Sequence, residues 1–211
     1  IKILKIASPE IRDDLLIDYI ARQKVFTILS TGVSTLKEIS RAKKIINKYH
    51  NNLAILQCSS IYPCPETLVG LNVIKEMKSK YLNKYEYGFS DHTTGSEAAI
   101  CSILYGAKYI EKHITFSKKM YGSDAKFAME PQEFKNFCDS IKKTKKIISN
   151  PVNKNNLKPY IKMKKIFEKR IIAKRDLNKG DKIKFSDLNF KKSNKGIKVF
   201  DYKKILGKIL K

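Results

Sequence analysis

Several features that mark other protein classes are missing from this 211-residue chain. It has no tryptophan, only five of its 44 basic residues are arginine, and its four cysteines form no CxxC pair. The cysteine spacing predicts reduced thiols that mostly pack, rather than a zinc site. No apolar run approaches the roughly 20 residues that cross a bilayer, and no charged-then-apolar leader is visible. We therefore expect a soluble cytoplasmic protein with no membrane partner.

Acidic residues are also scarce, because 20 stand against 44 lysines and arginines, a formal net charge of +24. A dense basic surface would suit nucleic-acid phosphates, but proteins that read bases and phosphates rely on the arginine fork. The lysine excess, with many isoleucines and asparagines, indicates a composition bias instead. We therefore expect no nucleic-acid partner, and keep a basic binder of anionic surfaces or nucleic acid as an alternative from another class.

The first 150 residues repeat one pattern, a short β-branched run followed by an amphipathic helical stretch. Five runs predict strands over residues 1–7, 25–29, 53–57, 85–89 and 109–114. Helices are predicted over residues 35–49, 70–80, 96–105 and 131–148. The first of these helices opens with Thr35 three residues before Glu38, the spacing of a capping box. The apolar side of the last is expected to consist of Phe134, Phe137, Ile141 and Ile147 or Ile148. This alternation predicts βα units and a parallel sheet.

Each predicted strand ends in small hydroxyl or ionisable side chains. They are Ser8, Ser30 with Thr31, Ser59 and Ser60 with Tyr62, Ser90 with Asp91 and His92, and Glu111 with Lys112 and His113. Ligands of parallel sheets bind at the carboxyl ends of the strands, so the pattern predicts a site there. Taken singly, each serine could instead cap the helix that follows it.

Two of the three histidines close neighbouring strands. The imidazoles of His92 and His113 can converge above the sheet, where with open positions they suit a divalent transition metal, Mn, Zn, Co or Fe, acting as a Lewis acid. The alternative is that each imidazole bonds to a neighbouring carboxylate, Asp91 or Glu111. His50, beside two asparagines, is expected on the surface.

Lys5 supplies the complementary charge, three residues before Ser8 at the end of the first strand. An ammonium group with hydroxyls and backbone amides suits a phosphate or a carboxylate. A cationic pocket beside a metal would bind a phosphorylated carboxylic acid.

A linker over residues 150–158 leads to a second, small module. Short strands are predicted over residues 170–173, 182–185 and 188–190, with a turn at residues 178–181. The charge is concentrated here, because residues 151–211 carry 20 basic and 5 acidic side chains, against 24 and 15 in residues 1–150.

Ten short motifs, in order along the chain, resemble the sialic acid synthase family, the phosphoenolpyruvate-condensing nonulosonate synthases. In the first part they are KIAS (5–8), LSTG (29–32), LQCSSIYP (56–63), GFSDHT (88–93), GAKYIEKH (106–113), GSD (122–124) and MEP (129–131). RIIA (170–173), DLNKG (176–180) and LGK (206–208) resemble the antifreeze-like (SAF) domain of that family.

The resemblance implies an α/β fold, a (β/α)8 TIM barrel joined to a small β-rich SAF domain. On this basis residues 1–149 form a partial barrel without its first three strands, residues 150–166 a linker, and residues 167–211 a SAF domain that is incomplete at its carboxyl end. The implied reaction condenses phosphoenolpyruvate with an N-acetylhexosamine, such as N-acetylmannosamine, to a nine-carbon 2-keto acid and releases phosphate.

The resemblance also implies a role for each site residue. His92 and His113 would hold the metal, Mn first, with Mg or Co as alternatives. Phosphoenolpyruvate would be bound by Lys5, Ser8, Ser30, Ser60 and Ser90. Tyr62 and Asp124 would face the sugar, and Glu111 would orient water or a substrate hydroxyl. Lys192, in place of a family arginine, would reach the sugar site of a neighbouring subunit in a homodimer. The alternative is an inactive fragment or a regulatory partner of a full-length synthase.

Overall fold

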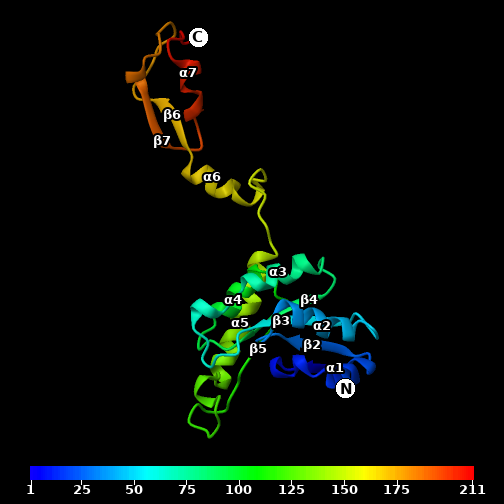
Figure 1. Cartoon of the computed structure of the whole chain (residues 1–211). Helices are drawn as coiled ribbons and strands as arrows, with labels where there is room; N and C mark the ends of the chain where they lie inside the picture. The colour runs from blue at the N-terminus through cyan, green and yellow to red at the C-terminus, as the bar shows by residue number, and fades with distance from the viewer. The chain divides into compact units, whose positions relative to one another are not determined.

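Strands and helices alternate along the first part of the chain, as the apolar pattern predicts. The computed structural model describes residues 1–211, which divide into two units, Ile1–Pro151 and Val152–Lys211 (Figure 1). The strands of the first unit are β1 (Ile3–Ile6), β2 (Phe26–Ser30), β3 (Leu53–Cys58), β4 (Glu86–Asp91) and β5 (Tyr109–Lys112). Its helices are α1 (Asp14–Arg22), α2 (Leu36–Ile46), α3 (Asn72–Lys80), α4 (Glu97–Leu104) and α5 (Pro131–Ile148).

The five strands form one parallel sheet in the order β1-β2-β3-β4-β5. β1 and β5 are its two edges, yet the Nζ atom of Lys5 on β1 lies 2.6 Å from Oε1 of Glu111 on β5. The rings of Phe26 on β2 and Tyr109 on β5 also meet, with centroids 5.3 Å apart. Contacts that reach past the intervening strands require a sheet that curls on itself. The sheet is therefore a half-barrel with these four side chains on its inner face.

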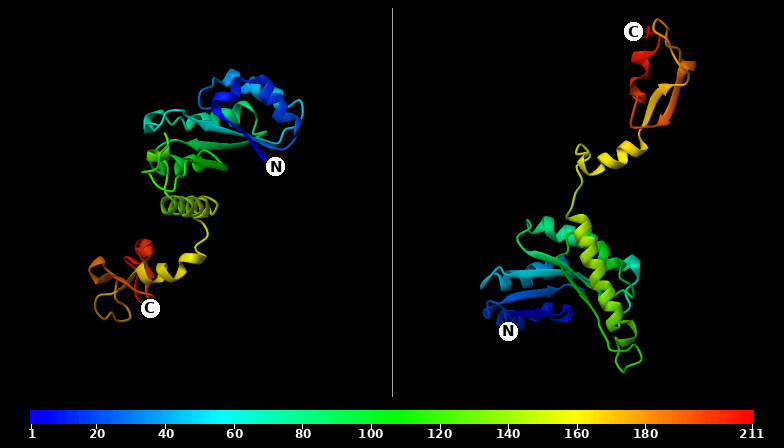
Figure 2. Two further views of the ribbon diagram at one scale, coloured as in Figure 1. Left: turned by 90° about the horizontal axis from the view of Figure 1, so that it is seen from below. Right: turned by 180° about the vertical axis from the view of Figure 1, so that it is seen from behind.

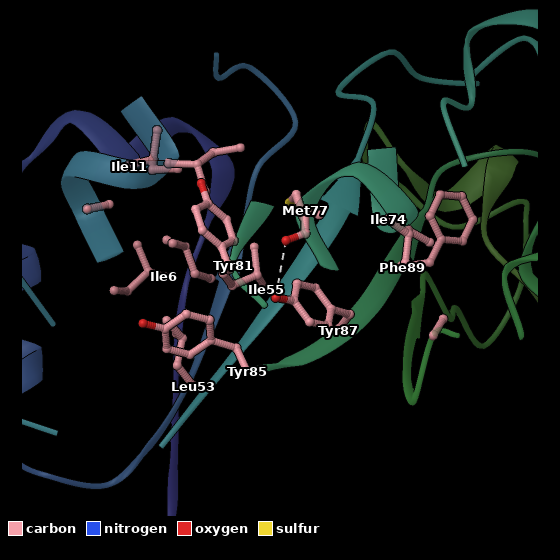
Figure 3. Packing of buried hydrophobic residues seen from close by; sticks show 14 of the residues in the cluster. Ile6, Ile11, Leu53, Ile55, Ile74, Met77, Tyr81, Tyr85, Tyr87 and Phe89 are labelled. Atoms are coloured by element: carbon pink, nitrogen blue, oxygen red, sulfur yellow. Dashed lines mark hydrogen bonds between the residues drawn. The ribbon is translucent and has the colours of Figure 1, made fainter. Parts of the chain in front are cut away.

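The helices cover the outer face of this sheet (Figure 2). Strand residues that point outward are buried, among them Ile6, Ile55 and Phe89, each no more than 2% exposed. Figure 3 shows Ile55 and Phe89 near the α3 side chains Ile74 and Met77, and there the Tyr87 hydroxyl donates to the backbone carbonyl of Met77 at 3.3 Å. Burial of one large apolar side chain contributes about 1.5–3 kcal/mol, so this layer keeps the strands and their ends in place.

The predicted capping box opens α2. The Thr35 hydroxyl accepts from the backbone N–H of Glu38 at 3.3 Å, and the Glu38 carboxylate accepts from the backbone N–H of Thr35 at 2.8 Å. Nε of Arg12 also donates to Glu38, at 2.6 Å. The box therefore ties α2 to the segment that follows β1.

Helix α5 spans the predicted residues, but its predicted apolar side is only partly correct. Phe137 is buried, and Phe134 and Ile141 pack against the core. Ile147 and Ile148 are 66% and 41% exposed. The packing of α5 on the unit therefore ends before the last turn of the helix.

The second unit holds a small antiparallel sheet in the order β7-β6-β8. Its strands are β6 (Lys169–Ala173), β7 (Leu188–Lys192) and β8 (Ile197–Lys198), and its helices are α6 (Ile161–Phe167) and α7 (Tyr202–Ile205). The predicted turn at residues 178–181 is present, because the Asp181 N–H donates to the Asn178 carbonyl at 3.0 Å and Gly180 has a φ of +96°.

The prediction of a strand over residues 182–185 is wrong. Only Lys182 pairs, in an isolated antiparallel bridge with Ile209, and a 3-10 helix follows at Phe185–Asp187. The cause is the Asp187 carboxylate, which accepts from the backbone N–H of Lys184 at 3.0 Å and so turns the chain. All of the helix α6 except its last residue, Phe167, lies within the predicted linker, residues 150–166. None of the helices in the chain is both long and apolar enough to span a membrane.

Candidate functional site

A continuous set of polar contacts joins the ends of β1, β4 and β5 on the inner face of the sheet. Lys5 Nζ donates to Oε1 of Glu111 at 2.6 Å, and the Ser90 hydroxyl donates to the same oxygen at 2.8 Å. Ser90 Oγ also lies 3.5 Å from Nε2 of His92. The curl of the sheet thus brings together four predicted site residues from distant parts of the sequence.

The imidazole of His92 is held in one orientation by the backbone. Its Nδ1 lies 3.0 Å from the carbonyl oxygen of Ser59, which can only accept, so Nδ1 carries the hydrogen. Nε2 is then left with a lone pair. Ser90 donates its single hydrogen to Glu111, so the groups placed to donate to Nε2 are the Tyr62 hydroxyl, 3.4 Å away, and the Cys58 thiol, 4.0 Å away.

His113 completes a cluster of three rings with His92 and Tyr62. The centroids of His92 and His113 lie 5.3 Å apart with the rings nearly perpendicular, and Tyr62 stacks on His92 at 4.2 Å. Oδ2 of Asp124 is 3.5 Å from Nδ1 of His113. These four side chains line one small pocket.

The alternative partners for the histidines, Asp91 and Glu111, are engaged elsewhere. Asp91 pairs with Lys112 at 2.9 Å, and Glu111 accepts from Lys5. Neither carboxylate therefore holds His92 or His113. Asp124, which comes from the loop after β5, is the carboxylate beside His113.

The electrostatic surroundings of the three rings differ. Burial lowers the pKa of His113, and the neighbouring His92 lowers it further. Burial acts in the same direction on His92, but hydrogen bonds with Cys58 and the Ser59 backbone, and the negative charges of Cys58 and Glu111, together outweigh it, so the pKa of His92 is raised. Burial and the nearby Cys58 and Asp124 raise the pKa of Tyr62, which therefore stays a neutral phenol near pH 7.

His92 and His113 are the two residues at this end of the sheet that could hold a divalent metal. His92 offers the Nε2 lone pair, and neutral imidazole is a good ligand for Mn, Co, Zn or Fe. No group of three or more His, Cys, Asp or Glu side chains is arranged to hold an ion in this chain. A metal bound here would rely on two protein ligands, with its other positions free for water and substrate.

A second cluster of hydroxyls lies at the ends of β1, β2 and β3. Ser8 Oγ accepts from the backbone N–H of Gly32 at 2.9 Å. A Cβ atom on Gly32 would lie 2.1 Å from Ser60 Oγ and 3.0 Å from Ser8 Oγ, so only glycine lets these groups approach. Ser30 is 2% exposed, and its buried Oγ has no hydrogen-bond partner. The Ser30 hydroxyl therefore keeps a donor free for an acceptor oxygen.

Two parts of the site were missed by sequence reasoning. Cys58 was predicted to be a packing thiol, and it is buried, but its Sγ lies 3.8 Å from Nδ1 of His92 and 3.9 Å from Ser60 Oγ. The ion pair of Asp91 with Lys112 was also missed. The only feature of the sequence that points to this ion pair is that each of its two residues directly precedes one of the two histidines. Lys192 lies on β7 of the second unit, with its Nζ 5.1 Å from the centre of the Phe167 ring.

The chain has the repeated βα units of the β/α-barrel class of proteins, and its polar site lies at the carboxyl ends of the strands. In that class this end of the sheet binds ligands. A family model described as the NeuB family matches residues 1–153. The chain belongs to the NeuB family, and the predicted resemblance to the sialic acid synthases is confirmed.

Individual relatives agree with this assignment. The chain is 35% identical to N,N'-diacetyllegionaminic acid synthase of Campylobacter jejuni, over 99% of this chain and 63% of the relative. It is 30% identical to pseudaminic acid synthase of the same species, over 97% of this chain and 59% of the relative. The crystal structure of the N-acetylneuraminic acid (sialic acid) synthetase of Leptospira borgpetersenii in complex with citrate is similar, with a TM-score of 0.70 and 30% identity over 79% of this chain and 59% of that one. The chain thus spans about three-fifths of the length of these relatives.

Proposed function

We propose that this chain is the site-bearing part of a nonulosonate synthase, which condenses phosphoenolpyruvate with an N-acetylhexosamine and releases phosphate. In this proposal the five βα units belong to an eight-unit barrel, and the second unit is a SAF-type domain. The observation that carries it is the chain of contacts from Lys5 through Glu111 and Ser90 to His92 in a member of this family.

The hydroxyl cluster supports binding of phosphoenolpyruvate. Ser8 and Ser60 lie against Gly32 at the strand ends, and Ser30 closes β2 with a buried hydroxyl that has no partner. Lys5 on β1 adds a positive charge. Phosphate and carboxylate oxygens accept hydrogen bonds from such groups, and charge-assisted bonds are the stronger ones. Lys5 and Ser90 both contact Glu111, so phosphoenolpyruvate would lie between the hydroxyl cluster and that carboxylate.

The histidine pair supports a sugar site beside it. His92 and His113 would hold Mn, or Mg or Co, and the ion when bound would polarise the aldehyde of the open-chain sugar. Tyr62 and Asp124, which line the same pocket, would hydrogen-bond the sugar. Lys192 of a neighbouring copy in a homodimer would contact its acyl group.

The proposed reaction balances without a redox partner. Carbon 3 of phosphoenolpyruvate forms a bond to the aldehyde carbon, whose oxygen takes up a proton and becomes a hydroxyl. Water adds at carbon 2, and Glu111 would orient it and accept its proton. The bond from carbon 2 to the bridging oxygen then breaks, and phosphate leaves with that oxygen. The new carbon-2 hydroxyl gives its proton to the leaving phosphate, and the 2-keto group forms. The enzyme would work in the cytoplasm.

An assay of phosphate release tests this proposal. The 211-residue chain is mixed with phosphoenolpyruvate, Mn²⁺ and either N-acetylmannosamine or a 2,4-diacetamido sugar, alone and together with a polypeptide carrying the first three βα units of the C. jejuni relative. We expect phosphate release that requires both the sugar and the metal and that is lost in the His92→Ala variant. His50→Ala, which alters the histidine outside the site, is the matched control and should keep full activity.

A soluble complex that releases no phosphate with either sugar would contradict the proposal. That result would favour the alternative of an inactive fragment or a regulatory partner.

A further inference from the structure

Behind the two histidines lies a fully buried ion pair. Lys112 Nζ is 2.9 Å from Oδ2 of Asp91, and the two side chains are 1% and 0% exposed. The same ammonium group donates to the backbone carbonyl of Thr93 and lies 3.4 Å from the Thr93 hydroxyl. Lysine is almost never buried so completely, and here its three N–H donors meet three oxygen acceptors.

The position of this pair in the sheet connects it to the site. Asp91 and Lys112 are register partners at the last paired position of β4 and β5. His92 and His113 are the next residues of each strand, with side chains on the opposite face. Lys112 contacts the residue before His92 and the residue after it, and Asp91 also accepts from the Thr93 backbone N–H at 2.9 Å. One ammonium group on the strand that carries His113 thus contacts the side chain of the residue before His92 and the backbone of the residue after it.

The other end of the same two strands provides a comparison. Lys108 and Glu86 also form an ion pair, at 2.7 Å, but their side chains are 68% and 39% exposed. Screening by water makes such a pair weak. Only the pair next to the histidines is removed from water, where a charge left without its partner is strongly unfavourable.

We propose that Lys112 and Asp91 are positioning residues, which fix the separation and orientation of the His92 and His113 imidazoles for metal binding. This inference rests on the proposed metal site and adds two residues to it. Residues behind metal ligands commonly change metal affinity about 10- to 100-fold when they are altered.

The test compares metal affinity with stability in matched variants of the full chain. Asp91→Asn/Lys112→Met removes both charges and keeps similar shapes, so its unfolding midpoint should stay near that of the unaltered chain. We expect its dissociation constant for Mn²⁺ or Co²⁺, measured calorimetrically, to rise at least about 10-fold. Glu86→Gln/Lys108→Met, the control at the exposed end, should change neither quantity. An unaltered affinity in a folded Asp91→Asn/Lys112→Met variant overturns the inference.

A second variant decides the question if the double variant does not fold. Lys112→Arg keeps the charge but replaces the compact ammonium by a wider planar group. We expect Lys112→Arg to fold and to bind Mn²⁺ several-fold more weakly, whereas a purely structural ion pair predicts no change in affinity.

The metal-free chain separates this inference from the proposed function. In nitrogen NMR of the imidazoles, the unaltered chain should show His92 as the Nδ1–H tautomer, and the double variant or Lys112→Arg should show a mixture. If the unaltered chain binds neither Mn²⁺ nor Co²⁺, but the variants lose the single His92 tautomer, the result contradicts the proposed metal site and leaves the positioning role standing. Variants that keep the single tautomer and the same affinity contradict the positioning role.

Discussion

Removal of the Lys112 charge alone should destabilise the first unit strongly. Asp91 is 0% exposed, and after Lys112→Met its carboxylate would keep only the N–H of Thr93 as a partner. Leaving one member of a buried pair uncompensated costs about 3–5 kcal/mol. For a slope of about 2 kcal/mol per molar urea, the unfolding midpoint would fall by roughly 1.5–2.5 M.

The matched variant is Lys108→Met, at the exposed end of the same strands. Its ion pair with Glu86 is largely solvated, so we expect a loss of no more than about 1 kcal/mol. Both variants are followed by circular dichroism in urea at pH 7, because the chain has no tryptophan for fluorescence. Adding Asp91→Asn to Lys112→Met should restore most of the lost stability. Equal costs for Lys112→Met and Lys108→Met would refute the electrostatic reasoning.

Three further predictions concern acid stability, catalysis and the core. The pKa of Glu38 is lowered to about 2, first by the Thr35 backbone N–H and then by Arg12, so its stabilising effect is complete above about pH 4.5 and is lost as the pH falls towards 2. In an acid titration, Glu38→Gln should not show this loss of stability between about pH 4.5 and 2. The same dependence of stability on pH in Glu38→Gln and the unaltered chain would contradict this prediction. Glu111→Gln should reduce phosphate release at least about 100-fold and, because its ion pair is partly exposed, change stability by about 1 kcal/mol or less in urea. A small rate effect would remove Glu111 from the proposed chemistry. Ile55→Ala, at a fully buried position, should cost about 2–5 kcal/mol in urea unfolding, and a cost below 1 kcal/mol would mean that the outer layer is loosely packed.

The parallel sheet was predictable because its signals are local. Alternating apolar runs fix the five strands, and the spacing of Thr35 and Glu38 marks the start of α2. The failure at residues 182–185 has the same origin. Lys182, Ile183, Lys184 and Phe185 alternate like a strand, but a carboxylate two residues beyond them, on Asp187, binds the backbone and turns the chain.

The site was only partly predictable because it depends on the curl of the sheet. Strand ends indicated the serines and histidines, which lie where the parallel register places them. The bond between Lys5 and Glu111 joins the two edges of the sheet, and no local pattern encodes that approach. The pair of Asp91 and Lys112 was missed because charged residues beside a site usually face solvent. Here the alternation of strand side chains turns both towards the helices.

The most direct test of the proposed function follows the bridging oxygen of phosphoenolpyruvate. The substrate is labelled with ¹⁸O between carbon 2 and phosphorus and incubated with the chain, the supplementing βα units, Mn²⁺ and the sugar acceptor. We predict that the label leaves in inorganic phosphate, where it shifts the phosphorus NMR signal, because water adds at carbon 2 and the C–O bond breaks. Label retained in the 2-keto acid, or the absence of sugar-dependent phosphate release, would contradict the account.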